Sequence, residues 1–321
     1  MTGAERREAL ATYLAQVLEA QGSVDIRGER RIAMGQSRAM YVLDLDYVGQ
    51  EGPVQRTVVA RVEQWGHLGS DSRDEVRTMQ MLHGLDYPVA RVLAYEPSND
   101  VLGQPFFVME YVPGTSVFHP DTTDEYIRTL DRLHRLDMST GDFDYLEQPR
   151  SPRDSALLQV ERWYGIYRSS IVGEPSPLLE EATQWLRNNA PATERVALVH
   201  GDPGPGNYMH VEGKLSAVVD WEFTHLGDPD EDWAYLIAMR GAAFLSEPEW
   251  LDRIKRIVGV EIDAERLRYW KAVNFLKGVC IDQTSHRIYA NRLNPAPNLL
   301  AIGTGVHLGA LKRLCDAVLE S

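Results

Sequence analysis

The 321-residue sequence contains only two cysteines, Cys280 and Cys315, and neither belongs to a CxxC pair. Two isolated thiols cannot build a disulfide framework, and free thiols are typical of a reducing compartment. The N-terminal segment is interrupted by charges and lacks the apolar run of a secretory signal peptide. We therefore expect a cytoplasmic protein.

Long apolar runs and excess positive charge are also missing. No stretch of about 18 apolar residues occurs, so no membrane span is expected. The chain has 33 Lys and Arg against 47 Asp and Glu, a net charge of −14. An acidic surface repels nucleic-acid phosphates and anionic lipids, so neither partner is expected. The acidic balance could favour a cationic ligand, but plain solubility is the better explanation of it. No feature sets an oligomeric state.

Two groups of familiar site motifs are absent. The sequence has no Walker A loop and no GxGxxG, so any phosphate-binding loop must be of another kind. It also has no HxH or HExxH pair, although His200, His210 and His225 lie within one segment. A metal-dependent hydrolase would need a richer histidine ligand set, which makes that function the weaker alternative.

The chain is longer than a single hydrophobic core usually requires, so two domains are expected. Its hydrophobic content of 44% and charged content of 25% are ordinary for a globular protein. In the first third, short alternating or β-branched runs predict an antiparallel sheet. The expected elements are a helix over 5–20, strands over 31–34, 40–47, 57–62, 90–95 and 105–111, and a helix from Ser70 or Ser72 to Gly84.

Helical periodicity dominates after a break at Val112-Pro113-Gly114. Thr122 and Glu125 have the spacing of a capping box and predict the start of the first helix there. Further helices are expected over 154–170, 177–189, 229–240, 247–257, 263–280 and 303–320, with two short strands over 196–199 and 215–219. The predicted fold class is α+β, with an N-terminal sheet lobe over 1–112 and a mainly helical lobe over 113–321.

Three polar residues follow the two short strands of the helical half. Asp202 and Asn207 follow the first strand, and Asp220 closes the second. Phosphoryl transfer needs a carboxylate that accepts the proton of the attacking hydroxyl, and hard oxygen ligands that hold Mg²⁺ against nucleotide phosphates. Asp202 suits the first role, and Asn207 and Asp220 suit the second. The sequence therefore predicts a kinase that uses ATP and Mg²⁺.

The pattern HGDxxxxN, with an Asp at the end of a strand some fifteen residues later, resembles the aminoglycoside phosphotransferase family. The resemblance implies a protein-kinase-like bilobal fold, with Asp202 as catalytic base and Asn207 and Asp220 as metal ligands. It covers nearly the whole chain, but only this segment is specific. The following run LGDPDEDWAYL resembles the branch that contains kinase domains fused to some acyl-CoA dehydrogenases.

Other polar residues of this segment are interpreted as structural. The resemblance implies that His200 organises the loop by hydrogen bonding. Asp228 precedes Pro229 and has the pattern of an N-cap, and we expect Asp232 to tie the loop in place. Glu222 lies two residues beyond Asp220, where a role beside the metal or substrate and a plain surface position are equally compatible with the sequence.

The nucleotide side rests on weaker patterns. Gly35-Gln36-Ser37 lies between two predicted strands and resembles the family's nucleotide loop, although a plain hairpin turn fits the sequence nearly as well. Kinases of this fold pair a strand Lys with a helix Glu. Here the corresponding positions carry Arg61 and Glu75, and Arg can fork onto two phosphate oxygens. A surface ion pair is the alternative for these two residues.

The joint at Glu110-Tyr111-Val112 resembles the hinge that meets adenine through backbone groups of Glu110 and Val112, and it is equally a simple linker. The predicted function is transfer of the γ-phosphoryl group of ATP to a hydroxyl of a small molecule. An aminoglycoside-like amino sugar, a hydroxyacyl thioester and other metabolites all stay open as acceptors. A catalytically inactive nucleotide-binding module is the main alternative, followed by the metal-dependent hydrolase.

Overall fold

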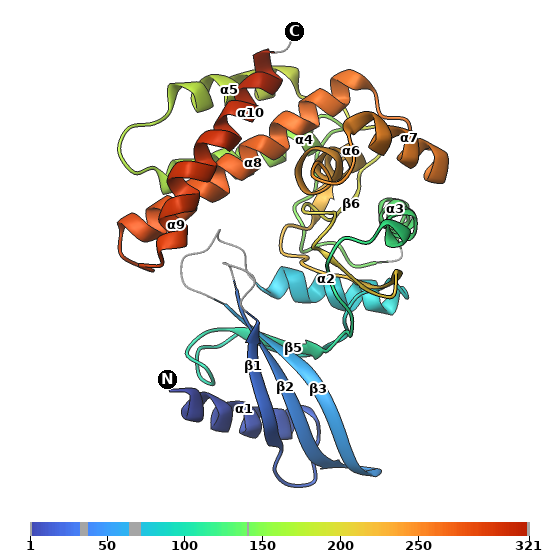
Figure 1. Cartoon of the computed structure of the whole chain (residues 1–321), viewed down its shortest axis with the longest axis vertical. Helices are drawn as coiled ribbons and strands as arrows, with labels where there is room; N and C mark the ends of the chain where they lie inside the picture. The colour runs from blue at the N-terminus through green and yellow to red at the C-terminus, as the bar shows by residue number, and fades with distance from the viewer. Residues whose placement is uncertain (1, 33–37, 64–71, 140, 320–321) are drawn as a thin grey trace. The chain divides into compact units, whose positions relative to one another are not determined.

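The computed structural model describes residues 2–32, 38–63, 72–139 and 141–319 (Figure 1). Gly35, Gln36 and Ser37, the predicted nucleotide loop, lie outside these residues. The chain divides into two compact units. Unit 1 comprises residues 1–114 and 216–222, and unit 2 comprises residues 115–215 and 223–321.

Unit 1 is built on an antiparallel sheet in the order β1-β2-β3-β5-β4. Leu10 and Leu14 on the first helix are completely buried and join a core with sheet residues such as Leu43, Val58 and Phe106. The elements are α1 (Gly3–Val17), β1 (Asp25–Ile32), β2 (Arg38–Gly49), β3 (Gly52–Glu63), α2 (Ser72–Gly84), β4 (Val92–Glu96) and β5 (Phe106–Glu110).

Unit 2 is mainly helical and is organised around α8 (Ala264–Ala290), which packs against α4, α6 and α10. In Figure 1, α10 runs alongside α8. The other helices are α3 (Pro120–His134), α4 (Asp154–Ser170), α5 (Pro177–Asn189), α6 (Pro229–Tyr235), α7 (Glu247–Val258), α9 (Pro297–Ala301), α10 (His307–Leu319) and two π-helical turns, η1 (Leu236–Arg240) and η2 (Ile302–Val306).

Short strands in the second half of the chain frame the predicted catalytic loop. β6 (Ala197–Val199) pairs antiparallel with β9 (His225–Gly227), and β7 (Tyr208–Val211) pairs with β8 (Lys214–Val218). β6 is buried along its whole length, so its end is a fixed point from which the next residues emerge. None of the helices within the described residues combines the length and apolarity needed to cross a membrane.

The first helix of unit 2 begins earlier than the sequence pattern predicts. α3 starts at Pro120, and its N-cap is His119, whose ring accepts a hydrogen bond from the Asp121 N–H. The Thr122 hydroxyl donates instead to the carbonyl of Gly213, 91 residues away. The capping-box prediction was therefore wrong, because a long-range partner took the side chain that the local pattern assigned to the helix end.

The helix expected over 229–240 is divided in two. Asp228 is the N-cap of α6, as predicted, and its side chain accepts from the Asp230 N–H with Pro229 in the first turn. The last five residues form the π-helical turn η1, which ends at Arg240. Such turns occur frequently at functional sites.

Candidate active site

The predicted catalytic loop leaves β6 at His200 and is fastened to a carboxylate behind it. The backbone N–H groups of His200 and Gly201 donate to the two oxygens of Asp232, over 2.8 and 2.9 Å. The Nε2–H of His134 donates to the same carboxylate over 2.9 Å. Asp232 is completely buried, so these bonds hold the start of the loop without competition from water.

Burial alone would raise the pKa of Asp232. The hydrogen bond from His134 and the nearby imidazoles of His134 and His200 outweigh burial, and the pKa of Asp232 is lowered. The carboxylate therefore stays charged in the fold. The expectation that Asp232 ties the loop in place is matched by these contacts.

Gly201 occupies a backbone position that other residues rarely adopt. Its φ is +82°, and a Cβ built there would lie 2.5 Å from the carbonyl oxygen of Phe223. A side chain at position 201 would therefore push the loop away from Phe223, which lies two residues before β9. This explains why glycine precedes Asp202.

A buried lysine supports the same peptide from the other side. Lys277 on α8 donates to the carbonyl of Gly201 and is only 1% exposed. Its ammonium lies 4.4–5.1 Å from the ring centroids of Trp163, Phe223 and Tyr235. Cation–π attraction compensates for part of the hydration energy that the ammonium loses on burial. Burial nevertheless lowers the pKa of Lys277, against the opposing charges of Asp202, Glu231 and Asp232.

The lowered pKa of Lys277 predicts a measurable effect on stability. Between that pKa and the ordinary lysine value of 10.5, the unfolded chain binds more protons than the folded chain, so the free energy of unfolding rises with pH. We expect Lys277→Met to remove this part of the rise. Urea unfolding at a series of pH values approaching 10.5 measures it. Parallel curves for the wild type and the variant would contradict the assignment.

The carboxylate of Asp202 is held by two side chains of unit 2. Arg240 donates from Nε to Oδ1 over 2.8 Å and from Nη2 to Oδ2 over 2.5 Å. Asn207 donates from Nδ2 to Oδ2 over 2.7 Å and to the Asp202 carbonyl over 2.8 Å. Asp202 is 4% and Asn207 5% exposed. The structure thus brings together two of the three predicted catalytic and metal-binding residues.

The orientation of Asn207 leaves its amide oxygen for another partner. Both hydrogen bonds of the Asn207 side chain use Nδ2, and within the described part of the chain no group donates to its Oδ1. An amide oxygen and a carboxylate are hard donors of the kind that Mg²⁺ takes, with water and phosphate oxygens completing its shell. The donor chemistry of Asn207 and Asp220 therefore fits a magnesium ion.

Asp220 lies in unit 1, two residues beyond β8. Its φ of +72° is unusual for a residue with a side chain, and such strain is commonly kept at functional positions. Arg61 donates to Asp220 Oδ1 over 2.7 Å, pairs with Glu75 at 2.8 Å and lies 3.8 Å from Glu222. Burial would lower the pKa of Arg61, but these three acids outweigh it and raise the pKa.

The Arg61–Glu75 pair is part of the interior of unit 1. Arg61 is 6% and Glu75 2% exposed. The alternative of a surface ion pair is therefore wrong. The Glu222 side chain is also largely buried, at 6% exposure. A buried fork between one guanidinium and several carboxylates sets the direction of Arg61 much more firmly than a surface pair would.

The predicted hinge residues lie at the end of β5. The Glu110 N–H donates to the Arg91 carbonyl over 2.9 Å, and the Glu110 side chain pairs with Arg56. Any contact of Glu110 with an adenine edge would therefore have to use its carbonyl oxygen. Val112 follows two residues later, outside the strand.

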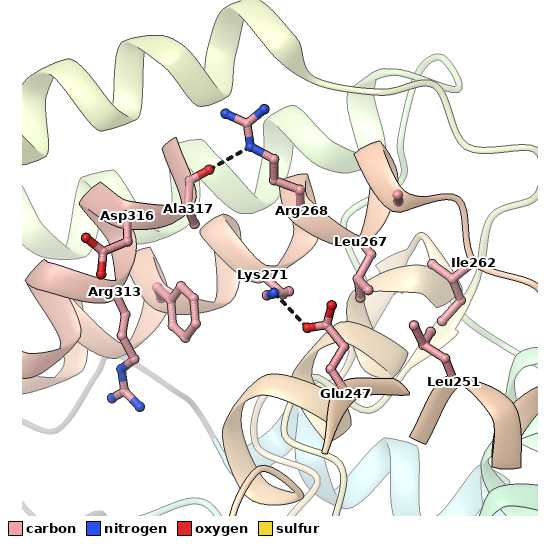
Figure 2. Close-up of a pocket in the computed structure, with 11 residues that line it drawn as sticks. Glu247, Leu251, Ile262, Leu267, Arg268, Lys271, Arg313, Asp316 and Ala317 are labelled. Carbon is pink, nitrogen blue, oxygen red and sulfur yellow. Dashed lines mark hydrogen bonds and ion pairs between the residues drawn. The ribbon is translucent and has the colours of Figure 1, made fainter. Parts of the chain in front are cut away.

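A separate cavity of about 370 Å³ opens in unit 2 between α7, α8 and α10 (Figure 2). Lys271 crosses it to Glu247 over 2.8 Å, and Arg268 donates to the Ala317 carbonyl over 2.8 Å. Both of these cations are paired inside the protein. The residues that line the cavity do not include Asp202, so we assign no ligand to it.

Sequence reasoning missed Arg240 and Lys277 as contacts of the loop. Arg240 carried no signal, because its partner Asp202 is 38 residues away in the chain. Lys277 carried a signal that was not used: it is the single charged residue in the run VNFLKGVC of a predicted helix. A lysine surrounded by apolar neighbours on a buried helix needs a partner.

Solved structures of known proteins share the fold of this chain. Over 97% of both chains, the structure superposes with a TM-score of 0.65 and 19% identity on a thermostable mutant of the aminoglycoside phosphotransferase APH(4)-Ia, a ternary complex with AMP-PNP and hygromycin B. A choline/ethanolamine kinase family protein from Mesorhizobium loti gives a TM-score of 0.62 at 16% identity, over 98% of this chain and all of that one. The predicted α+β, protein-kinase-like fold is confirmed.

Residues 29–270 match the phosphotransferase enzyme family APH, and the chain belongs to this family of small-molecule kinases. A curated relative, "Acyl-CoA dehydrogenase family member 10" of Mus musculus, is 32% identical over 218 residues, or 61% of this chain. The match spans only 20% of that relative's own length. The resemblance drawn from HGDxxxxN and LGDPDEDWAYL is thus confirmed at the level of the family.

Proposed function

We propose that the protein is an ATP-dependent phosphotransferase that moves the γ-phosphoryl group of MgATP to a hydroxyl of a small molecule. Asp202 is the base, and Asn207 and Asp220 are the magnesium ligands. The observation that carries the proposal is the fixed, buried carboxylate of Asp202, with the amide nitrogen of Asn207 turned toward it. That arrangement leaves an amide oxygen for a metal ion beside a proton acceptor.

In the proposed reaction the acceptor hydroxyl oxygen bonds to the γ-phosphorus, and the bond from that phosphorus to the β–γ bridging oxygen breaks. ADP leaves, and the hydroxyl proton passes to the carboxylate of Asp202. Magnesium, held by Asn207 and Asp220, would neutralise phosphate charge. Asp232 and Lys277 hold the peptide groups of Gly201 and thereby fix the loop that carries Asp202.

For the nucleotide we propose the N-terminal lobe, residues 1–112, and for catalysis and the acceptor the lobe of residues 113–321. Arg61, oriented by Glu75, is proposed to bind phosphate oxygens. The loop Gly35-Gln36-Ser37 is proposed to cover the phosphates. Glu110 and Val112 are proposed to meet the adenine edge through backbone groups.

The comparisons support ATP as donor and leave the acceptor open. A structural neighbour was solved with AMP-PNP and hygromycin B, an ATP analogue and an aminoglycoside. The names of the curated relatives point to acyl-CoA chemistry, although the chain matches only about a fifth of the first of them. Amino sugars and hydroxyacyl thioesters are therefore the two acceptor classes to separate.

The acceptor is found by measuring ADP release from MgATP. The panel contains aminoglycosides, hydroxyacyl thioesters, and choline and ethanolamine as simple amino alcohols. We expect one class to raise ADP release well above the rate with water alone, with a phosphate ester as the second product. If MgATP binds but no member of the panel is phosphorylated, the inactive nucleotide-binding module becomes the better description.

Binding of MgATP should also stabilise the fold. A ligand that binds only the folded state at about 100 times its Kd adds about 2.7 kcal/mol to the free energy of unfolding. We expect the thermal unfolding midpoint to rise with MgATP and less with ATP in EDTA. In Asp220→Asn the two conditions should give similar midpoints. A wild-type midpoint that is the same with and without magnesium would contradict the metal assignment.

A further inference from the structure

We propose that Arg240 is a positioning residue for phosphoryl transfer, which fixes the carboxylate of Asp202 so that only Oδ1 offers a vacant lone pair to the acceptor hydroxyl. The proposal rests on the proposed function, in which Asp202 receives the proton. It adds two things to that function: a residue that the catalytic motif does not contain, and the oxygen atom that accepts the proton.

The first support is the geometry of the fork. Nε and Nη2 of Arg240 donate to different oxygens of Asp202, over 2.8 and 2.5 Å. A two-point contact between a planar guanidinium and a planar carboxylate fixes the rotation of the carboxylate about its own bond. A single hydrogen bond from position 240, or a lysine in the same place, would restrict that rotation less.

The second support is that three of the lone-pair positions of the Asp202 carboxylate are already filled by N–H donors. An ionised carboxylate has about four lone-pair positions, two on each oxygen. Arg240 takes one on each oxygen, and Asn207 takes the second on Oδ2 over 2.7 Å. Within the residues that the structure describes, no further group donates a hydrogen bond to this carboxylate. One position on Oδ1 is left, and it is the place where an incoming hydroxyl can donate its proton.

The third support is that two features of the backbone make room for Arg240. The π-helical turn η1 ends with Gly241 N–H donating to the Leu236 carbonyl over 2.7 Å, which places Arg240 over the glycine-rich loop. A Cβ at Gly204 would lie 2.9 Å from the Arg240 Cβ, and one at Gly206 would lie 3.0 Å from its Nη1. The turn and the two glycines thus serve a contact that the motif HGDPGPGN alone does not explain.

The fork of Arg240 restricts the direction from which a proton can reach Asp202. As the hydroxyl attacks phosphorus, its proton must reach Asp202 along one direction, because the other positions are filled by fixed N–H donors. Misplacing a reacting group by about 1 Å can lower the rate of reaction by about 100-fold. Loss of Arg240 should therefore lower kcat without weakening MgATP binding.

The test uses Arg240→Ala in the full chain, with ADP release from MgATP measured with water as the acceptor and again with the acceptor found in the panel. We expect kcat to fall about 100-fold, with the KM for MgATP within twofold of the wild type. Guanidinium chloride, at concentrations too low to unfold the protein, should restore part of kcat, whereas sodium chloride should not. Arg240→Lys should stay slow, because an ammonium cannot form the fork.

A matched control is available in the same unit. Arg187 makes a similar fork onto Glu161, at 2.6 and 2.8 Å, and its side chain is 29% exposed against 30% for Arg240. Arg187→Ala should have wild-type kcat and no response to guanidinium. Unfolding midpoints of all variants show whether a slow variant is simply unfolded.

The outcomes separate the two proposals. If Arg240→Ala keeps kcat within twofold, or if it is slow and folded but guanidinium restores nothing, the positioning role is wrong while Asp202 stays the base. If Arg240→Lys restores full kcat, charge alone matters and the fork does not. If the wild type releases no ADP from MgATP with water or with any acceptor, the proposed function itself fails.

Discussion

Asp202→Asn should lower kcat for phosphoryl transfer by between 10²- and 10⁴-fold while leaving the protein folded. The neutral amide keeps the size of the side chain but has lost the basic oxygen, and proton transfer to a positioned base is worth about that factor. The side chains of Asn207 and Arg240 contact the Asp202 carboxylate only through N–H donors. Neither of these two residues can therefore replace Asp202 as the base. ADP release with the identified acceptor measures the loss.

Two controls make this result specific. MgATP should still raise the unfolding midpoint of Asp202→Asn, because the proposed metal ligands Asn207 and Asp220 are unchanged. Glu161→Gln removes another carboxylate of unit 2 that accepts a guanidinium fork, and it should have wild-type kcat. A folded Asp202→Asn variant that turned over its acceptor at the wild-type rate would refute the assignment of the base.

The candidate site was predictable from sequence where its residues are close in the chain and sit in turns. Asp202 and Asn207 lie five residues apart after a buried strand, with glycine and proline between them, and the structure holds them in contact. Arg240 and Lys277 were not predicted as parts of the site. Their contacts with residues 201 and 202 depend on how α6, η1 and α8 pack, and no local pattern records that packing.

The fold shows the same division between local and distant causes. α2, α4 and α5 match the ranges that their periodicity and flanking residues predicted. Thr122 was misassigned because the carbonyl of Gly213 competes for its hydroxyl. β9 was missed because three residues are too few for alternation to show, and only its pairing with β6 makes it a strand.

Burial decided what the sequence left open for Arg61. An Arg on a strand and a Glu on the next helix give the same sequence pattern whether they meet in solvent or in the interior. The structure buries both side chains and adds Asp220 as a third partner. A buried charge without a partner of opposite sign destabilises the folded state. Replacing Arg61 by a neutral residue should therefore lower the free energy of unfolding.

Asp232→Ala should have the largest effect on stability, lowering the free energy of unfolding by about 3–5 kcal/mol, the usual cost of removing one partner from a buried charged network. The variant leaves the N–H groups of His200 and Gly201 and the ring of His134 without their acceptor, in a place that water does not reach. Asp230→Ala, on the same helix but 18% exposed, should cost about 1 kcal/mol or less. Urea unfolding at neutral pH compares the two.

The pH dependence of stability distinguishes loss of the Asp232 charge from loss of packing. The pKa of Asp232 is lower in the fold than the ordinary value of 3.8, so the unfolded chain takes up the proton first as pH falls. Its stabilising contribution is complete above pH 3.8 and disappears as pH drops through the folded pKa. Asp232→Asn should therefore flatten the acid side of the stability curve. Equal acid slopes for the wild type and Asp232→Asn would mean that the carboxylate is not charged in the fold, and that neutral hydrogen bonds alone fasten the catalytic loop.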